Sequence, residues 1–280
     1  MATLKHITLR KHLILTCQQM NSLGINQGTS GNISVRTPDG FLISPSGIPY
    51  GAMKPEQVVA MDLDAGYHGD WLPSSEWRMH HDLFKARTEA GAIVHTHSTY
   101  ATALSCLRIE VPAFHYMIGV TGGTTLRCSG YASFGTQELS NTMLEALEDR
   151  TACLLANHGV ICFGPTLDKA LWLAGEIETL CKQYFVATQA GLPIILTEEE
   201  MTGVLARFKT YGKQAGDLAD GDAPAVEAPT RRDVKPARRT AAKKPAPKKA
   251  PISKTAPKPP AKAAAKAPAR RRAPRKTSGA

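Results

Sequence analysis

Apolar residues follow two different periods along most of the chain. Residues 4–23 place apolar side chains at helical spacing and stop at Gly24, which predicts a helix with a glycine after its last turn. Residues 33–43 carry an alternating apolar pattern around the turn-forming residues 38–40, and this is typical of a β-hairpin. Residues 57–66 predict a further strand and turn.

The rest of the pattern interleaves short apolar runs with longer stretches of helical spacing. One predicted helix opens with residues 73–76 (PSSE) and runs to about residue 90, with a serine suited to the N-cap and the acid to the first turn. The interleaving favours an α/β domain, and the hairpin-like neighbours favour a mixed, largely antiparallel sheet over a doubly wound one. The remaining predicted strands span 92–94, 152–156 and 159–164, and the remaining predicted helices span 99–106, 136–148, 167–190 and 198–208.

The composition changes after Asp222. Residues 223–280 contain 18 Lys or Arg and two acids, a net charge of +16, so the first 222 residues, with 16 basic and 22 acidic side chains, carry −6. This Lys/Ala/Pro-rich segment lacks aromatic residues and cannot bury enough surface to offset its ordering entropy. We therefore expect a folded domain over residues 1–215 and a disordered basic tail over residues 216–280. Linker-histone-type sequences are similar to the tail, so nucleic acid or another polyanion is a candidate partner, and a solvated tail without a partner stays equally open.

The cysteines and the hydropathy pattern indicate a compartment. The six cysteines are scattered among apolar residues and form no CxxC pair, as expected for reduced thiols in the cytoplasm. No apolar run approaches the roughly 20 residues that a membrane-spanning helix needs, and no secretory leader is recognised at the N-terminus. We therefore expect a cytoplasmic protein without a membrane partner.

Two histidines directly follow the apolar run at residues 92–94. His95 and His97 are two residues apart, so on a strand they lie on the same side and can present their imidazoles together. Alone, this pair is a weak signal, because polar residues also end ordinary strands. His158 follows another apolar strand and precedes a glycine, and Glu76 stands at the start of a predicted helix. Together the four residues form a candidate zinc site, since zinc takes imidazole and carboxylate ligands.

Other interpretations of the histidines stay open. His158 by itself is equally well explained as a turn residue that bonds to the backbone. Cys153, His158 and Cys162 could form a softer ligand cluster, although cysteines inside apolar strands are usually core residues. His80 and His81 follow no ligand spacing and are assigned to packing or to the surface.

Three short loops combine glycines with hydroxyl side chains: residues 28–32 (GTSGN), 44–47 (SPSG) and 73–76 (PSSE). Glycine lets the backbone approach a ligand closely, and a helix N-terminus preceded by serines favours a phosphate. None of the loops is a Walker or dinucleotide motif, so a nucleotide is not implied. Turn chemistry explains each loop singly, but three of them beside a candidate metal site favour binding of an anion.

The residues above stand in stretches that resemble the class II aldolase/adducin family. Within this family the chain is most similar to the members that cleave L-fuculose 1-phosphate. The resemblance implies a three-layer α/β/α sandwich and a homotetramer with active sites at the subunit interfaces. The matching stretches run in order through about residues 5–213 and read LGINQGTSGNISVR, SPSGIPY, LPSSEWRMH, AIVHTHS, PAFHYMI, YASFGTQELS, NHGVI, KALWLAGEIE and RFKTYG.

The resemblance also assigns roles to individual residues. It implies one Zn²⁺ per subunit on His95, His97 and His158, with Glu76 as a fourth ligand that moves aside to act as acid and base. It implies that Tyr116 of a neighbouring subunit protonates the aldehyde-derived oxygen. The substrate phosphate would be held by Thr29, Asn32, Ser46, Gly47, Ser74 and Ser75. The wall around the aldehyde end would be formed by Phe134, Phe208 and Tyr211.

The implied reaction is the reversible cleavage of a ketose 1-phosphate into dihydroxyacetone phosphate and an aldehyde. L-Fuculose 1-phosphate and a 5-deoxy- or methylthio-ribulose 1-phosphate both stay open as substrates. A sugar-phosphate 4-epimerase and a methylthioribulose-1-phosphate dehydratase are alternatives, because such enzymes share the zinc ligands within the family; Tyr116 favours aldol cleavage over them. A non-catalytic binding protein that acts through the basic tail is the alternative from another class.

Overall fold

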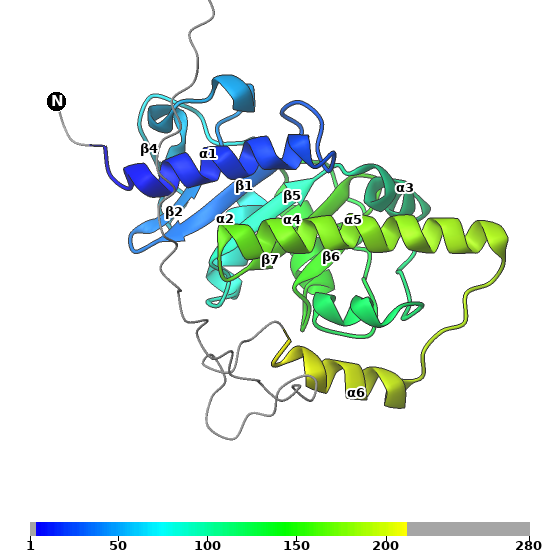
Figure 1. Cartoon of the computed structure of the whole chain (residues 1–280). Coiled ribbons are helices and arrows are strands. Elements are labelled where there is room, and N and C mark those ends of the chain that lie inside the picture. Colours follow the sequence, from blue (N-terminus) through cyan, green and yellow to red (C-terminus); the bar gives the residue numbers. More distant parts are fainter. Residues whose placement is uncertain (1–3, 212–280) are drawn as a thin grey trace, which may run out of the picture. The chain divides into compact units, whose positions relative to one another are not determined.

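A seven-stranded sheet forms the centre of the computed structural model, which describes residues 4–211 (Figure 1). Every pairing between the named strands is antiparallel, and one isolated parallel bridge joins Cys128 to Leu154. The expected, largely antiparallel character of the sheet is therefore confirmed. In the spatial order of the sheet, the strands are β4 (Tyr67–His68), β3 (Val59–Met61), β2 (Gly40–Ile43), β1 (Asn32–Thr37), β5 (Ala92–Thr96), β7 (Gly159–Gly164) and β6 (Ala152–Leu155).

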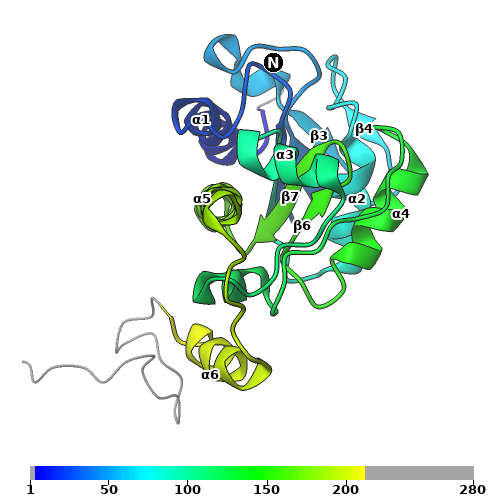
Figure 2. The ribbon, with the colours of Figure 1, turned by 90° about the vertical axis from the view of Figure 1, so that its right-hand side faces the viewer.

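Helices cover both faces of the sheet and complete the three layers (Figure 2). One face carries α1 (Ile7–Ser22), α3 (Thr99–Leu107) and α5 (Leu167–Ala190). The other face carries α2 (Trp77–Ala86) and α4 (Gln137–Ala146). The predicted α/β/α sandwich is thus confirmed. Three short 3-10 helices, η1 (Tyr50–Ala52), η2 (Pro55–Gln57) and η3 (Tyr116–Thr121), lie in the connections, and α6 (Glu198–Phe208) packs on η3 rather than on the sheet.

The side chains of β5 show that the sheet is buried on both faces. Ala92 and Val94 pack into the core shared with α1, α3 and α5, whereas Ile93 between them packs into the core shared with α2 and α4. All three side chains are buried. A strand covered on both sides reads as a continuous apolar run, which is the pattern seen before His95.

The helix α2 differs from the sequence-based expectation at both ends. Its N-cap residue is Glu76 rather than a serine, and the Glu76 side chain makes no capping hydrogen bond. The helix ends at Ala86 instead of near residue 90, because the following residues are used in pairing with the sheet. There Gly91 donates a hydrogen bond to the Gly164 carbonyl at 2.9 Å and accepts one from the Arg36 N–H at 2.8 Å. These sheet contacts outweigh the helical spacing of residues 87–90.

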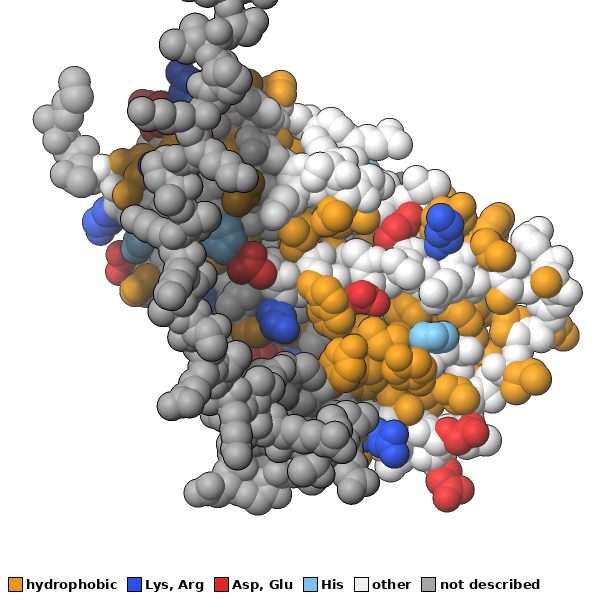
Figure 3. All heavy atoms as spheres, in the orientation of Figure 1, with side chains coloured by type: hydrophobic (Ala, Val, Ile, Leu, Met, Phe, Trp, Pro, Cys, Tyr) orange, Lys and Arg blue, Asp and Glu red, His pale blue; other side chains and the backbone are white. Residues whose placement is uncertain are grey.

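Hydrophobic side chains gather on the face that carries α5, η3 and α6 (Figure 3). Exposed large apolar residues of these elements include Tyr116 and Trp172, and Tyr211, also exposed, lies a few residues beyond the end of α6. Among residues 4–211, no helix has both the length and the apolar character that crossing a membrane requires. The predicted tail, residues 216–280, lies outside the described residues.

Candidate active site

Four side chains predicted as metal ligands meet in a single cluster. The ligand atoms of Glu76, His95, His97 and His158 all lie within 4.8 Å of one another. The Nε2 atoms of His95 and His97 are 3.0 Å apart. The Glu76 carboxylate reaches His95 with Oε2 at 3.2 Å and His158 with Oε1 at 3.0 Å. Three imidazoles and one carboxylate therefore converge on one point.

Each member of the cluster is placed by a different local feature. His95 stands on β5, His97 directly follows this strand, and the period of two puts both side chains on the α2 side of the sheet. Glu76 is delivered at the N-cap of α2. His158 lies in the tight turn between β6 and β7, where a Cβ on Gly159 would stand 2.4 Å from the Thr96 carbonyl oxygen. Only glycine therefore fits beside His158 without moving the end of β5.

The donor set fits a metal ion that prefers nitrogen and oxygen ligands. The Nδ1 atom of His95 lies 2.9 Å from the Val160 carbonyl oxygen, which can only accept, so Nδ1 carries the proton and donates. When the ring is neutral, its Nε2 lone pair faces the cluster, as in metal-binding histidines. The Oε1 atom of Glu76 is buried, and its 3.0 Å approach to His158 Nε2 does not have hydrogen-bond geometry, so this oxygen has no hydrogen-bond partner among the described residues. Such an orphaned carboxylate oxygen is suited to a cation, and tetrahedral Zn²⁺ takes this combination of ligands.

Electrostatics favour the metal-binding protonation state in two members of the cluster, Glu76 and His97. Burial acts to raise the pKa of Glu76, but the neighbouring imidazoles of His95 and His158 outweigh it and hold this pKa well below its ordinary value. Burial and then the nearby His95 and His158 lower the pKa of His97 to about 4. Near neutral pH the site therefore offers an ionised carboxylate and a neutral His97 imidazole, the forms that bind metal.

A cavity of about 390 Å³ opens beside the cluster. Two of the predicted phosphate-binding residues, Thr29 and Ser75, line it together with Glu76, and Phe134 lines it from the predicted substrate wall. Phe134 is largely exposed, as a residue that meets a ligand rather than the core would be. The remaining lining residues are Ser30, His97, Tyr131, Ala132, Ser133, Asn157 and His158.

The other predicted phosphate residues come from loops that are hydrogen-bonded together. The Ser46 N–H donates to the Leu72 carbonyl at 3.1 Å, and the Ser74 N–H donates to the Ser44 carbonyl at 3.0 Å. These bonds bring the Ser46–Gly47 turn beside the segment that leads into α2. Asn32 is buried, and its amide donates to Glu76 Oε2 at 2.9 Å. Binding of a phosphate by these residues stays a prediction.

Three predicted aromatic residues lie together, but away from this cavity. The rings of Tyr116 and Phe208 stack with their centroids 6.5 Å apart, and those of Phe208 and Tyr211 are 5.2 Å apart. This cluster belongs to η3 and the C-terminal end of α6. None of the three residues is in the lining of the cavity beside Glu76 that residues 4–211 form. Their predicted roles at the substrate stay predictions.

Sequence reasoning missed several residues of the site. Tyr131 and Asn157 line the cavity, and Asn157 adopts a left-handed backbone (φ 53°) next to His158. His80, expected at a packing or surface position, is fully buried, but the sequence did not predict its hydrogen bond to Asn32 at 2.5 Å. Burial lowers the pKa of His80 to about 3. One available signal was its position four residues after Glu76, which places the two side chains on the same side of α2. Cys153 and Cys162 are buried in β6 and β7, so the core reading of these two cysteines is the better one.

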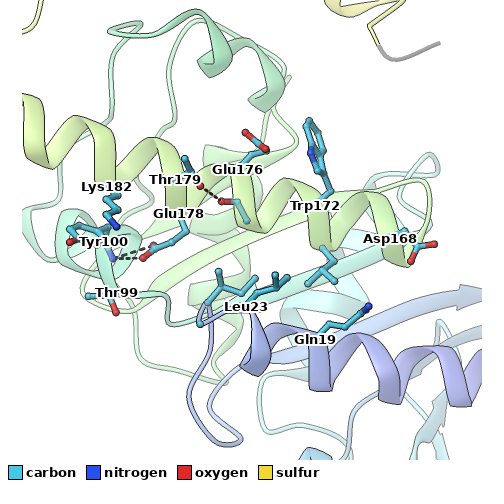
Figure 4. Close-up of a pocket in the computed structure, with 14 residues that line it drawn as sticks. Gln19, Leu23, Thr99, Tyr100, Asp168, Trp172, Glu176, Glu178, Thr179 and Lys182 are labelled. Carbon is cyan, nitrogen blue, oxygen red and sulfur yellow. Dashed lines mark hydrogen bonds between the residues drawn. The ribbon is translucent and has the colours of Figure 1, made fainter. Parts of the chain in front are cut away.

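A larger hollow of about 680 Å³ lies between α1 and α5 (Figure 4). Within it, Glu178 accepts hydrogen bonds from the backbone N–H groups of Tyr100 and Ala101, both at 2.9 Å. The carboxylate thus occupies the N-terminal end of α3 in the way an anion would. The described residues that line this hollow include none of the predicted site residues.

Comparison with known proteins identifies the family. Residues 11–185 match the family described as "Class II Aldolase and Adducin N-terminal domain". The chain is 48% identical over 209 residues to a 5-methylthioribulose-1-phosphate/5-deoxyribulose-1-phosphate aldolase from Rhodospirillum rubrum, with 75% of this chain and 95% of the relative covered. It is 45% identical over 205 residues to an L-fuculose phosphate aldolase from Escherichia coli K12, covering 73% and 95%. A solved structure of an L-fuculose 1-phosphate aldolase superposes with a TM-score of 0.70 at 39% identity, covering 71% of this chain and 95% of that one. The chain therefore belongs to the class II aldolase and adducin family, among its aldolases.

Proposed function

We propose that the protein is a zinc-dependent aldolase that reversibly cleaves a ketose 1-phosphate into dihydroxyacetone phosphate and an aldehyde. The observation that carries this proposal is the convergence of Glu76 and three imidazoles beside a cavity lined by Thr29 and Ser75. The named relatives support a phosphorylated ketose as the substrate class. L-Fuculose 1-phosphate and 5-deoxy- or methylthio-ribulose 1-phosphate are the candidates, since they share the half that carries the phosphate.

One Zn²⁺ per subunit, held by His95, His97, His158 and Glu76, would supply Lewis acidity to the oxygens of the developing enediolate. Glu76 moves the proton at carbon. Cleavage of the C3–C4 bond leaves its electron pair on the dihydroxyacetone phosphate half, and C3 then takes a proton from the Glu76 carboxyl. As the aldehyde forms, the C4 hydroxyl gives its proton to the phenolate form of Tyr116 of a second subunit. Exchange with solvent then returns a proton to the Glu76 carboxylate, so one proton leaves O4 for each proton delivered to C3. In the direction of synthesis both proton transfers reverse.

The remaining residues bind and orient the substrate. Backbone N–H groups and hydroxyls of Thr29, Asn32, Ser46, Gly47, Ser74 and Ser75 hold the phosphate. Phe134, Phe208 and Tyr211 form the wall at the aldehyde end. The separation of Phe208 and Tyr211 from the cavity in one chain supports an assembly in which a neighbour supplies them, and a homotetramer with shared sites is proposed. The enzyme domain would span residues 1–215.

A substrate panel tests the proposed activity. Purified protein is incubated with several ketose 1-phosphates, and dihydroxyacetone phosphate is measured in a coupled assay with and without a chelator. We expect product from at least one substrate, its loss on removal of the metal, and its return with Zn²⁺. Activity that survives complete removal of zinc, or no product from any substrate, would refute the proposal.

A substitution at Glu76 tests the acid/base role. Glu76→Gln keeps the size and the hydrogen-bonding capacity of the side chain but cannot exchange the proton, so kcat is expected to fall about 10²- to 10⁴-fold. Circular dichroism and thermal unfolding are expected to show a folded protein. Turnover close to that of the wild type would exclude Glu76 as the proton-transfer group.

The basic tail and the compartment are proposed separately. Residues 223–280 carry a net charge of +16, and we propose that this segment, part of a disordered tail over residues 216–280, contacts nucleic acid or another polyanion without reading its sequence. The cytoplasm is the proposed compartment, because the six cysteines are all free thiols.

A further inference from the structure

A chain of three hydrogen bonds runs from β1 through α2 to the Glu76 carboxylate. Ser34 Oγ lies 2.6 Å from His80 Nδ1, His80 Nε2 lies 2.5 Å from Asn32 Oδ1, and Asn32 Nδ2 donates to Glu76 Oε2 at 2.9 Å. All four side chains are buried, with Ser34 and His80 fully excluded from solvent. Buried polar groups are costly unless each one forms its hydrogen bonds, so the donors and acceptors along this chain must match at every step.

The donors and acceptors allow one arrangement of protons along this chain. The Glu76 carboxylate can only accept, so the amide nitrogen of Asn32 must face it and the amide oxygen must face His80. His80 then carries its proton on Nε2. Because a neutral imidazole has a single N–H, Nδ1 must accept from the hydroxyl of Ser34. Rotation of the Asn32 amide by half a turn would set its oxygen against the carboxylate and its NH₂ group against the His80 N–H.

Asn32 differs from the other side chains that contact Glu76. His95 and His158, at 3.2 and 3.0 Å from the carboxylate, both belong to the metal-binding cluster. A bound ion competes with Glu76 for their Nε2 atoms. Asn32 offers no atom to this cluster, so its N–H stays available to Glu76 whether or not an ion is bound. The orientation of this N–H depends on His80.

We propose that His80 is a positioning residue that acts through Asn32 to hold the Glu76 carboxylate in place while the imidazoles bind metal. The role in turnover rests on the proposed aldolase function, whereas the role in metal binding does not. Residues behind the ligands of a metal site commonly change metal affinity or activity about 10- to 100-fold when they are replaced. His80 lies one contact further away, because it bonds to Asn32 and not to a metal ligand. It is fully buried, so water cannot take over its hydrogen bonds when the side chain is replaced.

Three variants separate positioning from folding. His80→Leu removes both hydrogen bonds, whereas His80→Gln keeps an amide N–H near the place of the imidazole Nε2. His81→Leu is the matched control, since His81 is the next residue of α2, is buried, and makes two hydrogen bonds, to Asp82 and to the Leu63 carbonyl, away from the site. Thermal unfolding of each metal-free protein reports the structural cost of each change.

Kinetics with the best ketose 1-phosphate give the first readout. We expect His80→Leu to lower kcat about 10- to 100-fold with KM within about twofold of the wild type, since the loss concerns the reacting carboxylate rather than the phosphate. His80→Gln is expected to recover most of this kcat. His81→Leu is expected to lower the melting temperature but not kcat. Equal losses of kcat in all three variants, in proportion to lost stability, would overturn the proposal.

Zinc affinity gives a second readout that needs no substrate. Competition between the metal-free protein and a chromophoric chelator for Zn²⁺ is expected to show about 10-fold weaker binding for His80→Leu and near wild-type binding for His80→Gln. If the wild type cleaves no ketose phosphate, the proposed function fails, and this measurement still decides the role of His80. Wild-type zinc affinity together with wild-type kcat in His80→Leu would refute it.

Ser34→Ala keeps the inference testable if His80→Leu does not fold. It removes the hydroxyl that fixes His80 Nδ1 as an acceptor, at a smaller change in volume. We expect kcat to fall about 2- to 10-fold, the worth of one ordinary hydrogen bond. A kcat equal to that of the wild type would contradict the proposed order of protons.

Discussion

Gly31 offers a sharp test of how the loop at residues 28–32 rests on the metal site. A Cβ at this position would stand 2.6 Å from the His95 carbonyl oxygen and 2.6 Å from Asn26 Oδ1. The Gly31 N–H donates to the same Asn26 oxygen at 2.9 Å, and its carbonyl accepts from the Tyr50 hydroxyl. Gly31→Ala therefore forces a methyl group against β5 at the residue that supplies a metal ligand.

The size of the effect follows from what has to move. The Asn26 side chain could rotate away, which would break its bonds to Gly31 N–H and to the Ser30 hydroxyl, at about 1 kcal/mol each. The His95 carbonyl belongs to β5, an interior strand paired on both sides, and cannot yield without shifting it; such overpacking costs about 1–3 kcal/mol. We expect a total loss of about 3–5 kcal/mol. For a domain of this size, that is a fall in melting temperature of roughly 6–20 °C.

Urea and thermal unfolding of the metal-free protein measure this loss. Gly51→Ala is the control, because a Cβ on Gly51 meets no atom within 4 Å, and its change is expected to stay within about 0.5 kcal/mol. Zinc affinity is expected to fall in Gly31→Ala and not in Gly51→Ala, as only the first displaces His95. If Gly31→Ala unfolded within about 0.5 kcal/mol of the wild type, the close packing of this loop on β5 would be wrong.

Three further predictions concern stability and the tail. Tyr50→Phe leaves the buried Gly31 carbonyl without its hydroxyl donor, so urea unfolding should show a loss of about 1–3 kcal/mol. Burial lowers the pKa of His80 from 6.5 to about 3. Between pH 6.5 and about pH 3, His80 is therefore protonated in the unfolded chain but not in the folded protein. The free energy of unfolding of the metal-free protein should then fall as the pH drops from about 6.5 to 5. In His80→Gln, the slope of this free energy against pH should be smaller by up to about 1.4 kcal/mol per pH unit. Truncation after Lys213 should abolish binding to a labelled DNA duplex at low salt, and absence of such binding in the full chain would exclude the proposed polyanion contact.

The sequence predicts the elements of the domain better than their ends. Runs such as residues 92–94 are strands because both sides of the sheet are covered, and the hydrophobic pattern records this burial directly. The end of α2 at Ala86 could not be read in this way, because it depends on pairing of Gly91 with Gly164 far along the chain. Contacts between distant residues leave no periodic signal near either one.

The same reasoning applies to the site. The period of two places His95 and His97 together, so half of the metal cluster follows from local sequence. Glu76 and His158 were candidates from their places at a helix start and after an apolar strand, and the family resemblance implies them too, but local spacing does not show that they join the pair. The hydrogen-bond chain from His80 through Asn32 was missed because the two residues are 48 positions apart in the sequence, on α2 and β1. The cluster of Tyr116, Phe208 and Tyr211 likewise joins segments that the sequence keeps apart.

The register of β5 decides whether the site exists. In the antiparallel ladders, His95 lies opposite Asn32 on β1 and opposite Ile161 on β7, and Thr96 lies opposite Val160, whose carbonyl orients the His95 ring. The pairing of β5 therefore positions the metal ligand His95, fixes its tautomer, and places it opposite Asn32 in the hydrogen-bond chain to Glu76. Because side chains alternate, a slip of β5 by one residue would turn His95 toward α1, α3 and α5 and expose Val94 to the site. The apolar cores on both faces exclude this slip, since it would bury an imidazole among aliphatic side chains on one face. The packing that stabilises the fold is thus also what assembles the cluster.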